Sequence, residues 1–273
     1  MSRIFKSILW VLIYSAIYFI ISIVVGIIAS IFIFVFYAIS YGVAATDVST
    51  IEKVMYSYMG LLQFISYLII MGLISIIIYV RTKRMGESLW IRKPKKNIVL
   101  PVIFCAISAS FIVPVVLHWL TVIFPMDGLM QQYSQLMEDM DFGNPFINML
   151  LIAVFAPIFE EFFFRGAIYR ELRSSTPIWV AIVLQALIFG IFHMNVVQGL
   201  YAFGLGIILG LVYEWSRSLW VPIIFHAVFN AIGTSADYIP IFNNDIVVYI
   251  LAGLSVIVMI FTLKATRKYR RLG

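Results

Sequence analysis

Long apolar runs separated by short polar stretches dominate this chain, and they predict a bundle of membrane-spanning helices. A helix that crosses the hydrocarbon core of a bilayer needs about 20 predominantly apolar residues. Eight segments come near or exceed that length, and they cover residues 8–40, 54–80, 97–124, 146–172, 177–195, 199–215, 219–236 and 246–263. The pattern therefore predicts an all-α, polytopic membrane protein with about eight transmembrane helices.

The organisation along the chain favours one membrane domain over residues 1–273, because no repeat and no low-complexity linker divides it. Residues 1–124 would hold the first three spans. The first apolar run would be about 50 Å long as a helix, against about 30 Å of hydrocarbon, so we expect it to tilt, bend or project. The single cysteine, Cys105, cannot form a disulfide within the chain.

Two of the predicted helices carry small residues at four-residue spacing. These are Ser22, Gly26 and Ser30 in the first span, and Ala202, Gly206 and Gly210 in the sixth. Small side chains on one helix face let the backbones of membrane helices approach closely. We therefore interpret both stripes as helix-packing surfaces.

The distribution of charge predicts topology rather than a nucleic-acid partner, although the net charge is +6. Of the 19 Lys and Arg residues, 18 flank the predicted spans on the same side, and Lys53 is the exception. The opposite flanks carry acidic residues, among them Asp47, Glu52, Asp127 and Glu138. By the positive-inside rule, both termini are expected in the cytoplasm. Residue usage rich in Ile, Phe and Lys suggests an AT-rich bacterial genome, so we expect a bacterial plasma membrane and give less weight to a prenylated substrate.

The hydrophilic segment 125–145 connects the third and fourth spans. Its apolar residues fall near helical spacing, which predicts an amphipathic helix. Such a helix could be an interfacial connector or a lid that faces substrate. Elsewhere, Glu214 and Arg217 lie three residues apart at a predicted helix end, and we expect them to form a surface pair.

Three short runs place polar side chains inside apolar helices. They are Glu160-Glu161-Phe162-Phe163-Phe164-Arg165, Phe189-Gly190-Ile191-Phe192-His193 and His226-Ala227-Val228-Phe229-Asn230. An ionised side chain near the bilayer centre costs about 2.5–3.5 kcal/mol on insertion scales. Such a cluster is therefore a candidate functional site.

Helix geometry predicts different roles for the two adjacent glutamates. Neighbouring residues on a helix differ in direction by about 100°, whereas residues four apart share a face. Arg165 can therefore neutralise Glu161, which leaves Glu160 as the acid available for chemistry. The alternative is that Glu161 and Arg165 only staple the helix.

The two histidines also lie at positions from which they can reach one site. His193 shares a helix face with Phe189, and His226 shares one with Asn230. The predicted hairpin that turns near 174–177 brings Glu160 and His193 to similar depth. A carboxylate and two imidazoles can activate water and stabilise an oxyanion. We therefore expect the fourth, fifth and seventh helices to converge at the site.

These three motifs, in this order on separate hydrophobic helices, resemble the signature of the CPBP family of intramembrane endopeptidases. That family includes CAAX prenyl endoproteases, the Abi proteins and bacteriocin-processing or self-immunity proteins. The resemblance covers the motif-bearing part of the chain, residues 146–236. It implies a CAAX-type protease that hydrolyses a peptide bond of a membrane-associated protein or peptide.

The resemblance also implies a role for each site residue. Glu160 would be the general base on the attacking water, which His193 would help to hold, and His226 and Asn230 would stabilise the oxyanion. Glu161, Arg165 and Phe189 would shape the site. The family is often described as metalloprotease, and Glu160, His193 and His226 could also form a zinc set. Since Glu161 would then have to be the base while facing away from Glu160, we favour hydrolysis without a cofactor.

Two other classes of function remain open on the sequence. A proton-coupled transporter would use intramembrane acids, but transporters often show matching interrupted helices in two halves. A binding protein that confers immunity to a bacteriocin would need no catalysis, yet Glu160 and His193 are both present. Serine or cysteine catalysis is not expected, because no serine lies beside an obvious base and Cys105 has no motif partner.

Overall fold

The computed structural model describes residues 2–41, 48–139 and 144–268, and the described residues form helices and no strands. In chain order these are α1 (Arg3–Tyr41), α2 (Val48–Thr82), α3 (Met85–Ser88), α4 (Lys96–Ile123), α5 (Asp127–Asp139), α6 (Pro145–Asn148), η2 (Met149–Phe155), α7 (Ala156–Glu161), η3 (Phe162–Tyr169), α8 (Arg170–Arg173), α9 (Ile178–Phe192), α10 (Val196–Ser216), α11 (Trp220–Thr234), η4 (Ala236–Tyr238), η5 (Pro240–Asn243) and α12 (Asp245–Lys268). The all-α prediction is confirmed.

Each of the eight apolar segments predicted from the sequence contains a helix. Within the described residues, six helices are long and apolar enough to cross a membrane, and the run from α6 to α8 counts as one of them. The other two, α9 and α11, have 15 residues each. At 1.5 Å per residue they are about 22 Å long, which is shorter than the hydrocarbon core. The helices are therefore as predicted, but two of them do not span by length alone.

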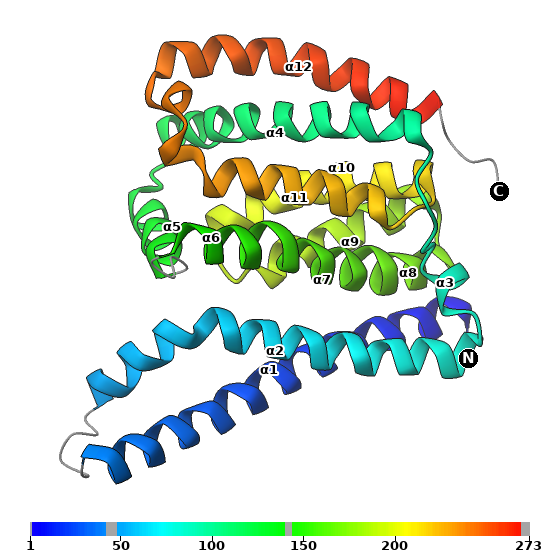
Figure 1. Cartoon of the computed structure of the whole chain (residues 1–273). Helices are drawn as coiled ribbons and strands as arrows, with labels where there is room; N and C mark the ends of the chain where they lie inside the picture. Colours follow the sequence, from blue (N-terminus) through cyan, green and yellow to red (C-terminus); the bar gives the residue numbers. More distant parts are fainter. Residues whose placement is uncertain (1, 42–47, 140–143, 269–273) are drawn as a thin grey trace.

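The motif-bearing helices lie in the middle of the molecule. In Figure 1, α4 and α12 lie along one side, α10 and α11 follow, then the run from α6 to α9, and the α1–α2 hairpin lies along the other side. One hydrophobic core joins these layers, and Tyr14, Ile70, Phe163, Phe189 and Tyr213 are buried in it. The site helices are therefore packed on both sides by other parts of the chain.

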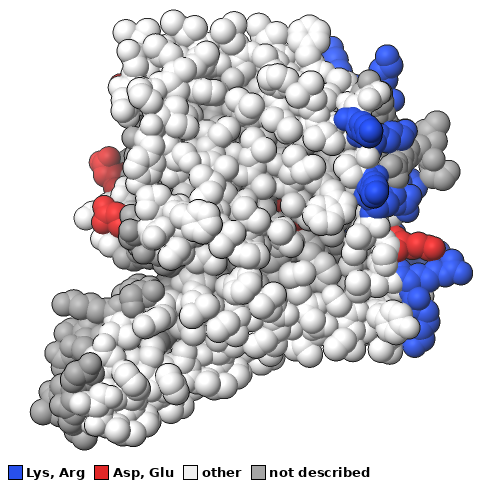
Figure 2. All heavy atoms as spheres, in the orientation of Figure 1, with Lys and Arg blue, Asp and Glu red and all other residues white. Residues whose placement is uncertain are grey.

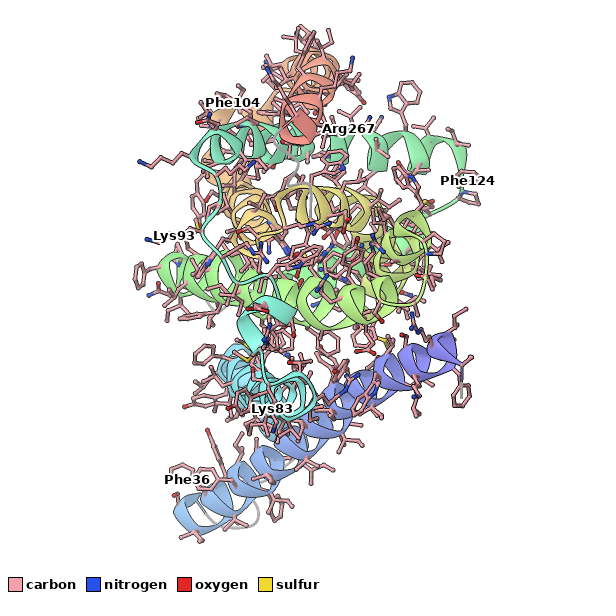
Figure 3. All side chains as sticks on the ribbon, turned by 90° about the vertical axis from the view of Figure 1, so that its right-hand side faces the viewer. Phe36, Lys83, Lys93, Phe104, Phe124 and Arg267 are labelled. Carbon is pink, nitrogen blue, oxygen red and sulfur yellow. The ribbon has the colours of Figure 1, made fainter. Side chains whose placement is uncertain are left out.

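Helix α1 leaves the bundle along its length. Its 39 residues would extend about 58 Å at 1.5 Å per residue. Figure 1 shows α1 running obliquely across α2, and in Figure 3 the labelled Phe36 lies far from the bundle. The sequence left open whether the first helix tilts, bends or projects, and in this structure its far end projects from the bundle (Figure 3).

Basic side chains gather at one end of the bundle, where α1 begins and α2, α8 and α12 end (Figures 1 and 2). There, Arg81 of α2 pairs with Glu171 of α8, with its Nη1 3.0 Å from the Glu171 Oε2. The guanidinium of Arg170 lies 3.9 Å from the centre of the Trp90 ring. The predicted charge asymmetry is present, and ion pairs and cation–π contacts fasten the helix ends together.

The expected surface pair of Glu214 and Arg217 is wrong. The side chain of Glu214 is 2% exposed, and its Oε2 accepts a 2.8 Å hydrogen bond from the Tyr169 hydroxyl. Its nearest cation is Arg173, at 3.8 Å. Sequence spacing suggested Arg217 because it is near in the chain, whereas the hairpin brings α8 against the end of α10.

The two stripes of small residues differ in what they contact. A Cβ added at Gly206 would lie 2.9 Å from the Ala186 Cα, and one at Gly210 would lie 2.8 Å from the Gln185 Nε2. A Cβ at Gly26 would meet no atom within 4 Å. The stripe in α10 is therefore a packing surface against α9, as expected, but at Gly26 the stripe in α1 contacts no other helix.

The amphipathic helix expected in the segment 125–145 is present as α5. Its Tyr133 ring contacts the Tyr201 ring of α10 edge to face, with 6.2 Å between centroids. Residues 140–143 of the segment lie outside the described residues. The choice between a connector and a lid stays a prediction.

Two π-helical segments flank the short helix that carries the glutamates. They are η2 and η3, which precede and follow α7. In a π-helix each carbonyl bonds to the N–H five residues later, so one extra residue enters the turn, and such segments are frequent at functional sites. Here they rotate α7 relative to the rest of its own span.

Candidate active site

A buried ion pair lies at the centre of the site. Arg165 Nη1 lies 2.8 Å from Glu161 Oε1, and neither side chain has exposed surface. Arg165 Nη2 also donates to the Gly206 carbonyl at 3.4 Å, and its guanidinium lies 4.4 Å from the centre of the Phe189 ring. The predicted i,i+4 pair is confirmed, and α9 and α10 hold the arginine in place.

His226 of α11 lies between the two glutamates of α7. Its Nδ1 is 2.8 Å from Glu161 Oε1, and its Nε2 is 3.7 Å from Glu160 Oε2. A carboxylate paired with an arginine accepts hydrogen bonds and donates none, so we assign the proton of this bond to Nδ1. The two glutamates do point in different directions, and the two nitrogens of one imidazole reach both.

Burial separates the two acids. Glu161 has no exposed side-chain surface, while the side chain of Glu160 is 16% exposed. The oxygen Oε2 of Glu160 is buried and has no hydrogen-bond partner. The Oε2 of Glu161 is unbonded too, but Glu161 is bonded through Oε1 to Arg165 and His226, whereas Glu160 is partly exposed beside the imidazole.

His193 ends helix α9 and is oriented by the backbone of that helix. Its Nδ1 lies 2.8 Å from the Phe189 carbonyl, which can only accept, so Nδ1 carries a proton here as well. The next residue, Met194, has φ 55°, a left-handed conformation that stops the helix. In the neutral ring, Nε2 then carries the lone pair and can accept a hydrogen bond.

The ring of Phe189 lies between the two histidines. It contacts the His193 ring edge to face at 4.7 Å between centroids and the His226 ring at 5.9 Å. The predicted convergence of the fourth, fifth and seventh apolar segments is thereby observed, with Phe189 as the spacer. Gly190 permits it, because a Cβ there would lie 2.7 Å from the Gly199 carbonyl of α10.

Asn230 bonds to the backbone of the span that carries the glutamates. Its Nδ2 donates to the Ile152 carbonyl of η2 at 2.9 Å. In the π-helical register the partner of that carbonyl is residue 157, and Pro157 has no N–H to donate. The Asn230 amide therefore supplies the bond that the proline cannot.

The residues proposed for zinc do not form a metal-binding group in this structure. Among the described residues, no three His, Cys, Asp or Glu side chains are placed to hold one ion. His226 Nδ1 is already bonded to Glu161, and His193 Nδ1 to the Phe189 carbonyl. Both bonds use Nδ1, and metal-binding histidines commonly hold their second ring nitrogen in this way, so the choice between a metal-dependent and a metal-free reaction stays a prediction.

Sequence reasoning missed three polar residues of the α1–α2 hairpin. The Tyr67 ring stacks on Phe159 with 3.7 Å between centroids, and the Tyr18 ring contacts Phe159 at 6.1 Å. Both hydroxyls lie next to Gln63 and are close enough to Glu160 to interact electrostatically with its carboxylate. The available signal was an amide with a tyrosine four residues later in an otherwise apolar run, which is weak.

Comparison with known proteins identifies the segment that carries this arrangement. The family model described as type II CAAX prenyl endopeptidase Rce1-like matches residues 142–232. The match covers about a third of the chain, so the similarity to the Rce1-like family is shown for residues 142–232. The Rce1-like segment contains all three motifs, which confirms the family relationship indicated by them.

Three curated bacterial relatives match over stretches of similar length. The chain is 31% identical over 90 residues to the membrane-embedded CAAX protease MroQ of Staphylococcus aureus strain USA300, covering 31% of this chain and 36% of MroQ. It is 27% identical over 97 residues to the putative membrane peptidase YdiL of Bacillus subtilis strain 168, covering 36% and 40%. It is 30% identical over 89 residues to the UPF0177 protein YaiH of Lactococcus lactis strain IL1403, covering 32% and 36%.

The similarity covers only a part of each protein. The chain matches between 36% and 40% of the length of these relatives. No solved structure matches the chain. Helices α1 and α2 lie outside the Rce1-like segment, so what they add to the site comes from the present structure alone.

Proposed function

We propose that this protein is an intramembrane endopeptidase that hydrolyses a peptide bond of a membrane-associated protein or peptide. The observation that carries the proposal is the placement of the His226 ring, bonded to the neutralised Glu161 on one side and facing the unbonded Glu160 on the other. A purely structural ion pair would need Glu161 and Arg165 but would not need Glu160. The Rce1-like segment supports the same assignment.

Glu160 is the proposed general base. It takes a proton from a water molecule held by the Nε2 lone pair of His193, and the hydroxide equivalent attacks the carbonyl carbon of the scissile bond. The C–N bond then breaks, and the proton held by Glu160 passes to the leaving nitrogen. The products are a new carboxylate and a new amine, and water is the only other reactant, so the reaction is balanced as a simple hydrolysis.

His226 and Asn230 are the proposed oxyanion stabilisers. An imidazolium at His226 donates from both nitrogens, from Nδ1 to Glu161 and from Nε2 to the oxyanion. It also balances the formal charges of Glu160, Glu161 and Arg165 to zero, which lowers the cost of a buried cluster. The Asn230 amide has two hydrogens, and one bonds to Ile152 while the other remains for the oxyanion.

We favour glutamate-driven hydrolysis over a zinc-dependent reaction. If Glu160, His193 and His226 held zinc, the base would have to be Glu161, which is bonded to Arg165 and His226. The purified protein is expected to keep its activity after dialysis against a strong chelator. A loss of activity that added zinc restores would replace this mechanism with a metal-dependent one.

We also propose that both termini lie in the cytoplasm, because the basic end of the bundle holds the start of α1 and the end of α12. The only cysteine, Cys105, is buried, which gives a low background for labelling. A cysteine introduced at Lys6 is expected to react with a membrane-impermeant maleimide only after the cells are opened. Labelling in intact cells would show that the N-terminus lies outside the cytoplasm and would overturn the proposed orientation.

The function is tested by a profile of peptide termini. Membranes and culture supernatant from cells that express the wild type are compared with those from cells that express Glu160→Gln at equal level, with Glu138→Gln on exposed α5 as the matched control. New termini are expected with the wild type and the control and not with Glu160→Gln. Identical profiles from three folded proteins would favour a binding or immunity role instead.

A further inference from the structure

The α1–α2 hairpin forms a polar wall beside the catalytic acid, made of Tyr18, Gln63 and Tyr67. Both tyrosine rings pack on Phe159, the residue that precedes Glu160. Tyr18 also contacts Phe163 at 5.5 Å and Phe192 at 5.1 Å between centroids. The wall is thus fixed against α7 and the end of α9, which carry Glu160 and lead to His193.

The amide of Gln63 lies in this wall with a donor left over. Its side chain lies beside the Tyr18 and Tyr67 hydroxyls, but its buried Nε2 makes no hydrogen bond of good geometry to either of them. A buried amide nitrogen without such a bond is uncommon in folded proteins. Such a group is a candidate for a hydrogen bond to a ligand.

A peptide substrate would bring the complementary group. Its backbone carbonyl and N–H groups need partners when they leave water, and in a membrane the protein has to provide them. A primary amide carries both a donor and an acceptor, so it can pair with a peptide unit as a neighbouring strand would. The motif residues of α7, α9 and α11 occupy one side of Glu160, and the wall of α1 and α2 occupies another.

We propose that Gln63 is a substrate-positioning residue that hydrogen-bonds the backbone of an extended peptide next to the scissile bond, supported by Tyr18 and Tyr67. This inference rests on the proposed endopeptidase function. The N-terminal helices then take part in substrate recognition. This recognition does not depend on the amino-acid sequence of the substrate, because Gln63 contacts only main-chain groups.

The test compares peptides that differ in one backbone amide. The wild type, Gln63→Met and the matched control Leu61→Met are purified in lipid nanodiscs and given a synthetic peptide library, from which the best cleaved peptide is taken. Leu61 is exposed on the same helix. Versions of that peptide are then made with an (E)-alkene in place of one amide, at each position within three residues of the scissile bond.

Gln63→Met is expected to lower kcat/KM for the parent peptide by about 10-fold, the effect of one lost hydrogen bond to a buried group. Leu61→Met is expected to match the wild type. With the wild type, one alkene peptide should show a kcat/KM about 10-fold below that of the parent peptide. With Gln63→Met, the same alkene peptide and the parent peptide should have equal kcat/KM. Because that comparison is made within each variant, a general loss of stability does not produce it.

The outcomes separate this inference from the function on which it rests. If the wild type cleaves the library and Gln63→Met lowers kcat/KM by the same factor for the parent peptide and for every alkene peptide, Gln63 is structural and the inference is overturned. The same holds if Gln63→Met matches Leu61→Met. If the wild type cleaves no peptide, while the termini profile also shows no product, the endopeptidase function is overturned first and this inference with it.

Discussion

The Rce1-like segment and the α1–α2 hairpin differ in what their polar groups contact. In the segment, Arg165, Gln185 and His226 are buried, and each bonds to another part of the protein. In the hairpin, the Gln63 Nε2 makes no hydrogen bond of good geometry and Gly26 faces open space. The segment therefore bonds charged and polar groups of different helices to one another, although Glu160 Oε2 and Glu161 Oε2 have no partner, whereas the hairpin places an unbonded amide beside the site.

Burial follows the same division. Of the most apolar window of α10, 44% is buried inside the molecule, against 6% of that of α1. Substitutions in the segment should therefore act on folding as well as on chemistry, while those in the hairpin should act mainly on recognition. The predictions below test this difference, beginning with the largest expected effect.

Removal of the central arginine should produce the largest loss of stability. Arg165→Met leaves Glu161 buried with only His226 as a partner, and breaking a buried pair in this way costs about 3–5 kcal/mol. The free energy of unfolding is measured by chemical denaturation in detergent micelles. The matched control is Arg84→Met, which removes an ion pair with Glu87 whose side chains are 73% and 70% exposed.

For the Arg84→Met control the expected change is within about 1 kcal/mol, as for other exposed ion pairs. Equal losses in the free energy of unfolding for Arg84→Met and Arg165→Met would show that burial does not make the Arg165 pair more important for stability. The Rce1-like segment would then not differ from the rest of the chain in this respect.

The second prediction concerns Asn230 and the carbonyl that Pro157 leaves without a donor. Asn230→Ala should cost about 1–3 kcal/mol, the penalty of an unsatisfied buried acceptor. Pro157→Ala restores an N–H at the position that faces the Ile152 carbonyl, so the double variant should recover most of the lost stability. Both are measured by thermal unfolding in nanodiscs.

Activity of the same double variant separates the two roles of Asn230. If the residue also stabilises the oxyanion, stability should return in the double variant while kcat stays low. Full recovery of kcat in the double variant would mean that Asn230 has only the structural role. If stability does not recover, the lack of an N–H at Pro157 is not what makes the Asn230 bond necessary.

The smallest expected effects compare the two stripes of small residues. Gly206→Ala places a methyl 2.9 Å from the Ala186 Cα, and forced overpacking costs about 1–3 kcal/mol. Gly26→Ala meets no atom within 4 Å and should be neutral, or stabilise by up to about 1 kcal/mol as alanine does in a helix interior. Both are followed by the midpoint of thermal unfolding.

A clear loss with Gly26→Ala would mean that α1 packs closely against another helix there, for example in a second copy of the chain. The α1 stripe would then be a packing surface after all.

Local rules predicted much of the motif-bearing region. The spacing of Glu161 and Arg165 set their pairing, and the hairpin at 174–177 set the depth of the site. These features depend on helix periodicity, which the sequence carries directly. The family signature added that three separated helices meet, since spacing along the chain does not specify which faces pack.

Contacts between distant segments could not be predicted in the same way. The bond of His226 to Glu161 depends on the rotation of α7, and that rotation depends on the π-helical turns of η2 and η3, which have no strong sequence signal. The partner of Glu214 was missed because Tyr169 approaches it from another helix. Gln63 was missed because an amide in an apolar run has no motif to mark it.

The most direct test of the central claim is the rate of peptide hydrolysis by purified Glu160→Gln in nanodiscs. The substrate is a peptide that the wild type cleaves, and Glu138→Gln is the control. Because glutamine keeps the shape of the side chain but cannot accept the proton, kcat should fall by about 100-fold or more, with an unchanged unfolding midpoint. A folded Glu160→Gln protein that cleaves at the wild-type rate would contradict the account.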